Sequence, residues 1–400
     1  MKEHDDFKYA CLFGGGAIRG AAHVGVVKAL RQLEIEPTIY AGSSVGSIIA
    51  VLYALGYTDE ELSEVFLSVN FEIFRDIAFG FNNKFALSKG EVFLDWIRDL
   101  IEKKFYSENY SKGNMPPVKF RDINKNLVII TTDLKEFKCC EFSSYETPDY
   151  EIAMAVRISC CMPGLMRAVT KDDKLLVDGD LMKGKPMWAL SKNLQNIPER
   201  ILEIRLEGVF TGTDQNPIEY VNGMYTCMTY SETDFIKDLY KDNDKYDYLV
   251  INTGNVVVVD FNYPVDKRQQ IMDNGYNQTI EYFKKTSPKK KSNILGIYDE
   301  ILNSMRNIQA DILFGKYNRA KLKIAELFIY LSKTQNVIDK NLYAKISEFQ
   351  KLLYSNVKSG LLGYYSCKDK STVKSALSTL ITDLTNRIES INKYLSKFSV

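Results

Sequence analysis

The chain has 400 residues, of which 45% are hydrophobic, and its 52 Lys and Arg residues nearly balance its 51 Asp and Glu residues. This length leaves room for one large α/β domain and a second unit, and the near-zero net charge argues against a nucleic-acid partner. The seven cysteines include the adjacent pairs Cys139-Cys140 and Cys160-Cys161, a pattern that favours free thiols in a reducing compartment over a disulfide framework.

The first predicted element is a buried strand at Phe7–Phe13, which leads into a glycine-rich loop. The loop begins with Gly14–Gly16, and a helix over residues 21–33 follows it. Such a loop exposes backbone N–H groups that bind an anion. A dinucleotide-binding fingerprint is the alternative, but Arg19 stands where its third glycine belongs. We therefore interpret the loop as an oxyanion hole, which binds the negative oxygen formed when a nucleophile attacks a carbonyl.

The second predicted element is a sharp turn at residues 42–46, with the sequence G-S-S-V-G, between a β-type run and an apolar helical run. This is the setting of a nucleophile elbow, in which a strained turn exposes the hydroxyl of the central residue, here Ser44. Gly42 and Gly46 remove the side chains that would clash as the strand and the helix approach each other. The alternative is a Gly/Ser-rich turn that only connects two elements.

The histidines of the chain argue against a Ser-His-Asp triad. There are two, His4 and His23, and neither lies downstream of Ser44. In α/β-hydrolases the triad histidine follows both the nucleophile and the acid. His4 lies in a charged N-terminal tail, and we expect His23 to pack on the helix behind the glycine loop. The base that serves Ser44 is therefore expected to be a carboxylate.

The candidate base is Asp178, which ends the apolar run Leu175–Val177 and precedes Gly179. Open α/β sheets place their sites at the carboxyl ends of strands, and a carboxylate beside a serine hydroxyl accepts its proton when the site is dry. A tight Asp-Gly turn without a catalytic role is the alternative. Asp180 is a rival base, which we expect to be a solvated turn residue.

The remaining elements of the first two-thirds alternate between strands and helices, which implies a mainly parallel sheet covered on both faces. Strands are expected at 126–133, 138–143, 201–206, 248–252 and 256–259, and helices from residue 58, over 88–105 and over 269–285. The aromatic-rich stretch Phe66–Phe85 is interpreted as a subdomain packed on the core, with a lid or lipid-contacting cap as the alternative.

The composition changes at Thr286–Lys291, a turn with a basic run that we interpret as a domain boundary. Beyond it, apolar residues recur at steps of three and four, as in the seams of helical bundles. The seams are Ile294, Tyr298, Ile301, Met305, Ile308 and Ile312; Leu342, Ile346, Phe349 and Leu353; and Leu377, Ile381, Leu384, Ile388, Ile391 and Leu395. We expect domains at 1–285 and 286–400, the second all-α.

The motifs at Gly14–Val26, Gly42–Gly46 and Asp178-Gly179 resemble, in their order and spacing, those of the patatin-like phospholipases. The segment Ala155–Gly164 is similar to the family's run of small residues that ends in proline. The resemblance covers about residues 7–285 and implies a three-layer α/β/α domain and a lipid acyl hydrolase with a Ser-Asp dyad. The family usually has a small residue after Asp-Gly, where this chain has an aspartate.

The resemblance also implies a role for each matching residue, with Ser44 as nucleophile and Asp178 as base. The oxyanion hole is expected at Gly14, Gly15, Gly16 and Ala17, with Arg19, Gly42, Gly46 and Gly179 as supporting residues. We expect phospholipase A activity of the A1 or A2 type through an acyl-enzyme, with no cofactor and no metal. The alternatives are an acyltransferase or a neutral-lipid lipase that uses the same dyad, and a catalytically silent scaffold that works through its C-terminal helices.

The expected partners follow from the same features. The charged start MKEHDD lacks the apolar core of a secretory signal, and no run approaches the ~18–20 apolar residues of a membrane span. We therefore expect a cytoplasmic protein that visits membrane surfaces as a peripheral enzyme and acts on phospholipid or another lipid ester. Arg19 is expected to position the glycine loop rather than to face a lipid phosphate. Residues 290–400 are a candidate surface for self-association or for a protein partner.

Overall fold

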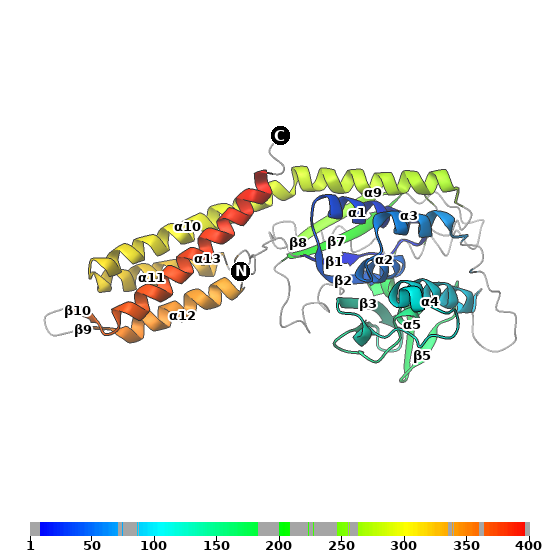
Figure 1. The fold of residues 1–400 in the computed structure, drawn as a ribbon, viewed down its shortest axis with the longest axis horizontal. Helices are drawn as coiled ribbons and strands as arrows, with labels where there is room; N and C mark the ends of the chain where they lie inside the picture. The colour runs from blue at the N-terminus through cyan, green and yellow to red at the C-terminus, as the bar shows by residue number, and fades with distance from the viewer. Residues whose placement is uncertain are drawn as a thin grey trace. The chain divides into compact units, whose positions relative to one another are not determined.

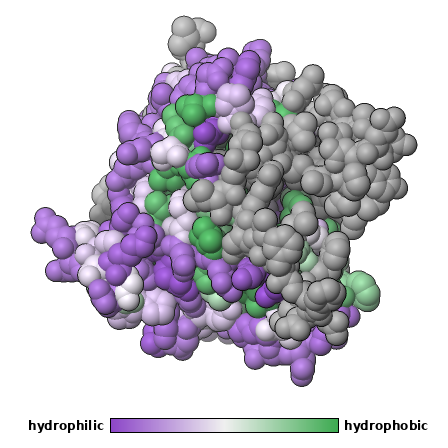
Figure 2. Space-filling model, turned by 90° about the vertical axis from the view of Figure 1, so that its right-hand side faces the viewer, coloured by the Kyte–Doolittle hydropathy of each residue, from purple (hydrophilic) through white to green (hydrophobic). Residues whose placement is uncertain are grey.

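The computed structural model describes residues 9–70, 74, 86, 88–182, 200–208, 223, 227, 246–254, 256, 263–334, 338, 340–359 and 364–396. These residues divide into two compact units, one from Tyr9 to Tyr282 and one from Phe283 onward (Figure 1). None of the helices in these ranges combines the length and the apolar character that a membrane span requires. On the face shown in Figure 2, most of the described residues at the edge of the molecule are hydrophilic, and hydrophobic residues gather nearer the middle.

The first unit is built on an eight-stranded sheet in the order β5-β6-β3-β2-β1-β7-β8, with β4 paired to β3. The strands are β1 (Tyr9–Phe13), β2 (Pro37–Ser43), β3 (Asn126–Asp133), β4 (Lys138–Ser143), β5 (Val169–Lys171), β6 (Lys174–Asp178), β7 (Arg200–Glu207) and β8 (Tyr246–Asn252). The pairs β1–β2, β1–β7, β2–β3 and β7–β8 are parallel, whereas β3–β4, β3–β6 and β5–β6 are antiparallel. Every residue of β1 is buried, so both faces of the sheet are covered.

Helices flank this sheet, which confirms the predicted α/β class with a mainly parallel sheet. They are α1 (Ala21–Gln32), α2 (Val45–Ala54), α3 (Asp59–Ser68), α4 (Glu91–Tyr106), α5 (Ile152–Ser159) and α9 (Val265–Lys285), with short 3-10 turns η1 (Ala17–Gly20), η3 (Ser107–Asn109), η4 (Phe120–Asp122) and η5 (Gly179–Met182). The predicted start of α3 is confirmed, because Thr58 and Glu61 form a reciprocal capping box.

The two strands that matter most for the site share one edge of β3. Strand β2 pairs with the first part of β3, up to Ser43 opposite Ile130, and β6 pairs with the last part, from Asp178 opposite Thr131. The other edge of β3 is occupied by β4. The carboxyl ends of β2 and β6 therefore meet on the same edge, and the residues that end these two strands become neighbours.

Two phenylalanines of the aromatic-rich stretch, Phe66 and Phe74, are among the described residues, and both are buried. Phe66 is 2% exposed and Phe74 is 7% exposed. The ring of Phe74 lies against Phe93 and Trp96 of α4, with centroids 5.2 and 5.1 Å apart. These two rings pack in the core, as the favoured interpretation expects. Phe71, Phe79, Phe81 and Phe85 lie outside the described residues, as do the last three positions of the strand expected at 256–259.

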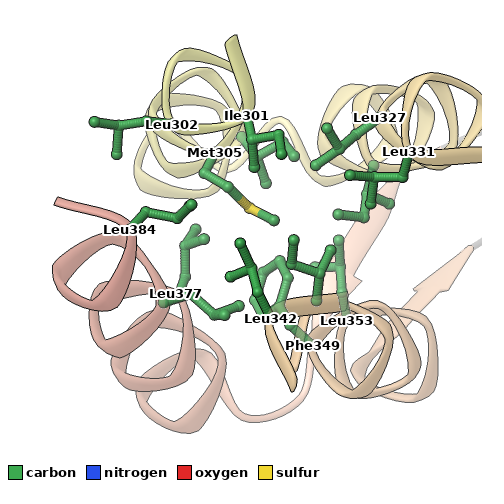
Figure 3. Packing of buried hydrophobic residues seen from close by; sticks show 14 of the residues in the cluster. Ile301, Leu302, Met305, Leu327, Leu331, Leu342, Phe349, Leu353, Leu377 and Leu384 are labelled. Atoms are coloured by element: carbon green, nitrogen blue, oxygen red, sulfur yellow. The ribbon is translucent and has the colours of Figure 1, made fainter. Parts of the chain in front are cut away.

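The second unit is helical, as predicted, and has its own apolar core (Figure 3). It contains α10 (Ser287–Leu313), α11 (Tyr317–Lys333), α12 (Lys340–Asn356) and α13 (Lys370–Ser396). The predicted seams line this core: all their residues are buried except Ile381 and Leu395, which are partly buried and pack against it.

Two details of the second unit differ from the sequence-based expectation. A short antiparallel hairpin, β9 (Val357–Ser359) with β10 (Tyr365–Cys367), interrupts the helices. The sequence between its strands contains two glycines, which disfavour helix. The basic run is also not a turn, since α10 begins at Ser287, two residues after the end of α9, and Lys291 is fully buried within it.

Candidate active site

The turn between β2 and α2 holds Ser44 in a conformation that few L-residues adopt, with φ 50° and ψ −132°. Such backbone strain costs ~1–3 kcal/mol and persists only where the surroundings enforce it. A Cβ on Gly42 would overlap the carbonyl of Gly46, and a Cβ on Gly46 would overlap the carbonyl of Phe13. Both positions therefore require glycine, which is the local geometry that a nucleophile elbow needs.

Ser44 and Asp178 meet where β2 and β6 end, so the predicted contact between them is present. The Ser44 hydroxyl donates to Oδ2 of Asp178 at 2.7 Å, while Oδ1 accepts from the Asp180 amide at 2.8 Å. Ser44 is 5% exposed and Asp178 is fully buried, and a hydrogen bond is stronger in such a low-dielectric setting. Gly179 lies against β3, because a Cβ there would overlap the carbonyl of Ile130.

A further serine, which the sequence did not single out, holds the elbow in place. Ser159, the last residue of α5, accepts from the Ser44 amide at 2.9 Å and donates to the carbonyl of Ile130 at 2.6 Å. Ser47 donates to the Ser44 carbonyl at 2.6 Å. The main chain of Ser44 is thus fixed at both its amide and its carbonyl. The available signal was the segment Ala155–Gly164, which contains Ser159.

Two of the four predicted oxyanion donors in the glycine loop already donate to groups of the protein. The Gly14 amide donates to a carbonyl of β7 at 2.9 Å, and the Gly15 amide donates to Oδ1 of Asp180 at 3.1 Å. Among the described residues, nothing accepts from the amides of Gly16 and Ala17. Both of these residues have positive φ, 151° and 47°. In this structure the candidate oxyanion donors therefore narrow to Gly16 and Ala17.

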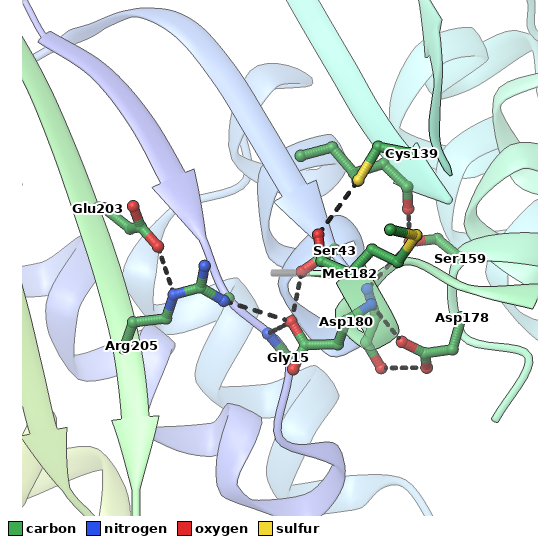
Figure 4. Close-up of polar contacts among 12 residues, drawn as sticks. Gly15, Ser43, Cys139, Ser159, Asp178, Asp180, Met182, Glu203 and Arg205 are labelled. Carbon is green, nitrogen blue, oxygen red and sulfur yellow. Dashed lines mark hydrogen bonds and ion pairs between the residues drawn. The ribbon is translucent and has the colours of Figure 1, made fainter. Parts of the chain in front are cut away.

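Asp180 is buried at the centre of the site, so the expectation of a solvated turn residue is wrong. It is 2% exposed, and its Oδ1 accepts from the Ser43 hydroxyl at 2.8 Å as well as from the Gly15 amide. Figure 4 shows it between Asp178 on one side and Arg205 on the other. An Arg205 guanidinium nitrogen lies 3.5 Å from the same oxygen. The sequence did not indicate this contact because Arg205 comes from β7, which only the tertiary fold brings to the site.

His23 and Arg19 support the loop from within the fold. Nε2 of His23 lies 2.8 Å from the Gly14 carbonyl, and burial lowers the pKa of His23 to about 4, against the smaller raising effect of that bond. The imidazole is therefore neutral at pH 7 and donates its Nε2 proton to Gly14, while packing near the loop as expected. Arg19 is 2% exposed, and its Nε and Nη2 donate to the Val256 carbonyl at 3.0 and 2.7 Å.

The arrangement combines a hydroxyl on a strained turn, a carboxylate in contact with it, and a glycine loop whose Gly15 lies against the serine. Such a set can move a proton from the hydroxyl and stabilise an oxyanion, which is the chemistry of acyl transfer to a serine. In the described ranges of the chain, no cluster of His, Cys, Asp and Glu side chains is arranged to hold a metal ion.

Comparisons with known proteins find similarity over the part of the chain that carries the site. Residues 12–190 match the family model described as "Patatin-like phospholipase". Two curated relatives are "Uncharacterized protein R571" of Acanthamoeba polyphaga mimivirus, 31% identical over 187 residues, and "Uncharacterized protein YqhO" of Bacillus subtilis (strain 168), 27% identical over 199 residues. Each match covers 45% of this chain, and the matches span 60% and 66% of the respective relatives. Among solved structures, VipD from Legionella pneumophila is similar with a TM-score of 0.48 and 14% sequence identity, over 96% of this chain and 91% of that chain.

Proposed function

We propose that this chain, whose residues 12–190 match the patatin-like phospholipase family model, hydrolyses an acyl ester of phospholipid as a phospholipase A. Ser44 is the nucleophile and Asp178 is its base. The observation that carries the proposal is the 2.7 Å hydrogen bond from the Ser44 hydroxyl to Asp178, made on a strained turn. The glycine loop lies against Ser44, and no described residue accepts from the amides of Gly16 and Ala17. The substrate is taken from a membrane surface that the protein visits as a peripheral enzyme.

In the first half of the reaction, Oγ of Ser44 attacks the ester carbonyl carbon and its proton passes to Oδ2 of Asp178. The carbonyl oxygen becomes an oxyanion, which accepts hydrogen bonds from the amides of Gly16 and Ala17. The ester C–O bond then breaks, and the departing alkoxide takes the proton from Asp178. The products of this half are a lysophospholipid and an acyl-enzyme on Ser44.

In the second half, water attacks the acyl carbonyl and gives its proton to Asp178. A second oxyanion forms at the same amides and collapses, so the acyl C–O bond to Ser44 breaks. Oγ of Ser44 recovers the proton from Asp178, and the fatty acid leaves. No histidine is required, because one buried carboxylate accepts and returns the proton in both halves.

The test is fatty-acid release from phosphatidylcholine vesicles by the full chain and by its Ser44→Ala and Asp178→Asn variants. We expect both variants to lose at least ~10³-fold in kcat with an unchanged melting temperature. Ser63→Ala is the matched control, since Ser63 lies in α3 and donates to the Asp59 carbonyl, outside the site. Release by Ser44→Ala at the wild-type rate would rule the proposal out.

The same assay separates the finer alternatives. Identification of the lysophospholipid shows whether the sn-1 or the sn-2 ester is cleaved. An added labelled lysophospholipid that becomes acylated would show acyl transfer in place of hydrolysis. A fluorophosphonate probe labels Ser44 only if the serine is activated, and a failure to label would favour the scaffold alternative.

A further inference from the structure

Asp180 connects the segments from which the site is built. Its Oδ1 accepts from the Gly15 amide of the glycine loop and from the hydroxyl of Ser43, the last residue of β2. The same oxygen faces Arg205 of β7. The Asp180 amide donates to Oδ1 of Asp178, the carboxylate oxygen that does not accept from Ser44. One side chain therefore touches the loop, the elbow strand and β7, while its own amide orients the proposed base.

A buried carboxylate is costly unless it is paired, and here the pairing is extensive. Asp180, Arg205 and Glu203 are 2%, 3% and 2% exposed. Arg205 pairs with Glu203, which also accepts from the hydroxyl of Tyr246. Burial alone would lower the pKa of Arg205, but the carboxylates of Glu203 and Asp180 outweigh it and raise that pKa above its ordinary value. Arg205 is thus a fixed cation that holds the carboxylate of Asp180 in place.

The glycine loop lies directly against the nucleophile. A Cβ built on Gly15 would stand 2.6 Å from Oδ2 of Asp180 and 2.8 Å from Cβ of Ser44. The Gly15 amide is used by Asp180, whereas nothing in the described part of the chain accepts from the next two amides. Where Gly15 is held therefore decides where the amides of Gly16 and Ala17 lie relative to Ser44, and misplacement by about 1 Å can cost ~10²-fold in rate.

We propose that Asp180, clamped by Arg205, is a positioning residue that fixes the glycine loop against the elbow and so presents the Gly16 and Ala17 amides to the oxyanion. This inference rests on the proposed function, since it assumes that an oxyanion forms at Ser44. It also gives a physical reason for an aspartate where the resemblance leads us to expect a small residue. The carboxylate takes no proton from Ser44 and does not touch the substrate.

The experiment compares Asp180→Ala and Asp180→Asn with the wild type in the full chain. The readouts are the melting temperature, the fraction of protein labelled to completion by a fluorophosphonate, the labelling rate, and kcat and KM on phosphatidylcholine vesicles. The phosphonate oxygen requires the same donors as the oxyanion, so the labelling rate reports the position of the loop. The fraction labelled counts folded sites and separates slow chemistry from lost protein.

We expect Asp180→Ala to label completely but ~10²-fold more slowly, with a similar fall in kcat and a KM within about twofold of the wild type. Asp180→Asn keeps an oxygen that can accept from Gly15 and Ser43, so it should recover about tenfold or more of the lost rate. A purely structural role would lower the melting temperature and the labelled fraction without this split between kcat and KM.

Asp247→Asn is the matched control, because Asp247 is also fully buried and accepts from the Tyr9 and Tyr282 hydroxyls at 3.0 and 2.7 Å. It lies near the start of β8, away from the carboxyl ends of the strands. We expect it to lower the melting temperature and to leave the rate per labelled site unchanged. If Asp180→Ala does not fold, Ser43→Ala removes the hydroxyl that donates to Oδ1 of Asp180 and should slow labelling several-fold.

Three results would overturn the inference. Equal labelling rates for the wild type and Asp180→Ala would show that the loop is positioned without the carboxylate. Faster labelling of Asp180→Ala would show that the carboxylate obstructs the site. If Asp180→Asn labels as slowly as Asp180→Ala, the oxygen that accepts from Gly15 and Ser43 has no role in positioning the loop. None of these results contradicts the proposed function, which fails instead if Ser44→Ala still releases fatty acid at the wild-type rate.

Discussion

At the scale of single residues, the buried imidazole of His23 makes the stability of the fold depend on pH. The pKa of His23 lies at about 4 in the folded chain, below its ordinary value of 6.5. Between these values the unfolded chain binds a proton that the folded chain does not, so the free energy of unfolding falls as the pH falls. From pH 7 to pH 5 this one group should remove about 2 kcal/mol.

The measurement is urea unfolding of the wild type and His23→Gln at both pH values. Glutamine can still donate to the Gly14 carbonyl but does not titrate, so the variant should lose about 2 kcal/mol less than the wild type between pH 7 and pH 5. Carboxylates that titrate in this range contribute equally to both proteins and cancel in the difference. Identical losses would show that His23 is not held neutral in the folded chain.

Ser159 provides a second test at this scale, because it satisfies a backbone amide at the strained elbow. Ser159→Ala leaves the Ser44 amide without its acceptor, which should destabilise the fold by ~1–3 kcal/mol and slow fluorophosphonate labelling. Ser88→Ala is matched to it, since Ser88 also accepts from an amide, that of Gly90, and donates to the Phe74 carbonyl. Both variants should lose stability in thermal unfolding. Equal labelling rates in the two variants would show that Ser159 has no part in holding the elbow.

At the scale of elements, helices α1 and α9 approach until their backbones touch. A Cβ on Gly25 would overlap the Met272 carbonyl, and a Cβ on Gly275 would overlap the Ala22 carbonyl. Gly25→Ala must push the helices apart, and we expect it to destabilise the first unit by ~1–3 kcal/mol in thermal unfolding. Gly296→Ala is the opposite case, since no atom lies within 4 Å of the Cβ that it adds to α10.

For Gly296→Ala we expect a gain of ~0.5–1 kcal/mol, because alanine loses less backbone entropy than glycine in a helix. Both substitutions replace glycine by alanine in a helix. If they change the free energy of unfolding in opposite directions, the contact between α1 and α9 is the cause of the difference. A loss for Gly296→Ala, or none for Gly25→Ala, would contradict the close approach of α1 and α9.

The elements that the sequence predicted well are those whose determinants are local. The cap of α3 needs only Thr58 and Glu61, and the glycines on either side of Ser44 are enough to indicate the turn of the elbow. The contact between Ser44 and Asp178 was expected from the resemblance, but its cause, two strands sharing one edge of β3, is a property of the sheet. The burial of Asp180 could not be predicted, because its counterion lies 25 residues further along the chain, on β7.

At the scale of the whole molecule, the chain carries two compact units, and each has a buried core of its own. Stability in such a chain need not be lost in a single step, because each core can be weakened separately. Fluorophosphonate labelling of Ser44 would report on the first unit, and the helical circular dichroism reports on the helices of both units. These two readouts allow the units to be followed in one protein.

Leu342→Ala tests this division, since Leu342 is fully buried in the core of the second unit. The cavity should cost that unit ~2–5 kcal/mol, so part of the helical circular dichroism should be lost at a lower temperature than in the wild type. Fluorophosphonate labelling of Ser44 should persist at that temperature, because the first unit keeps its core. Leu322→Ala is the control, since Leu322 is 58% exposed and its truncation leaves no cavity. If labelling and helical signal are lost together at the lower temperature, the two units unfold as one, and the cores are not independent.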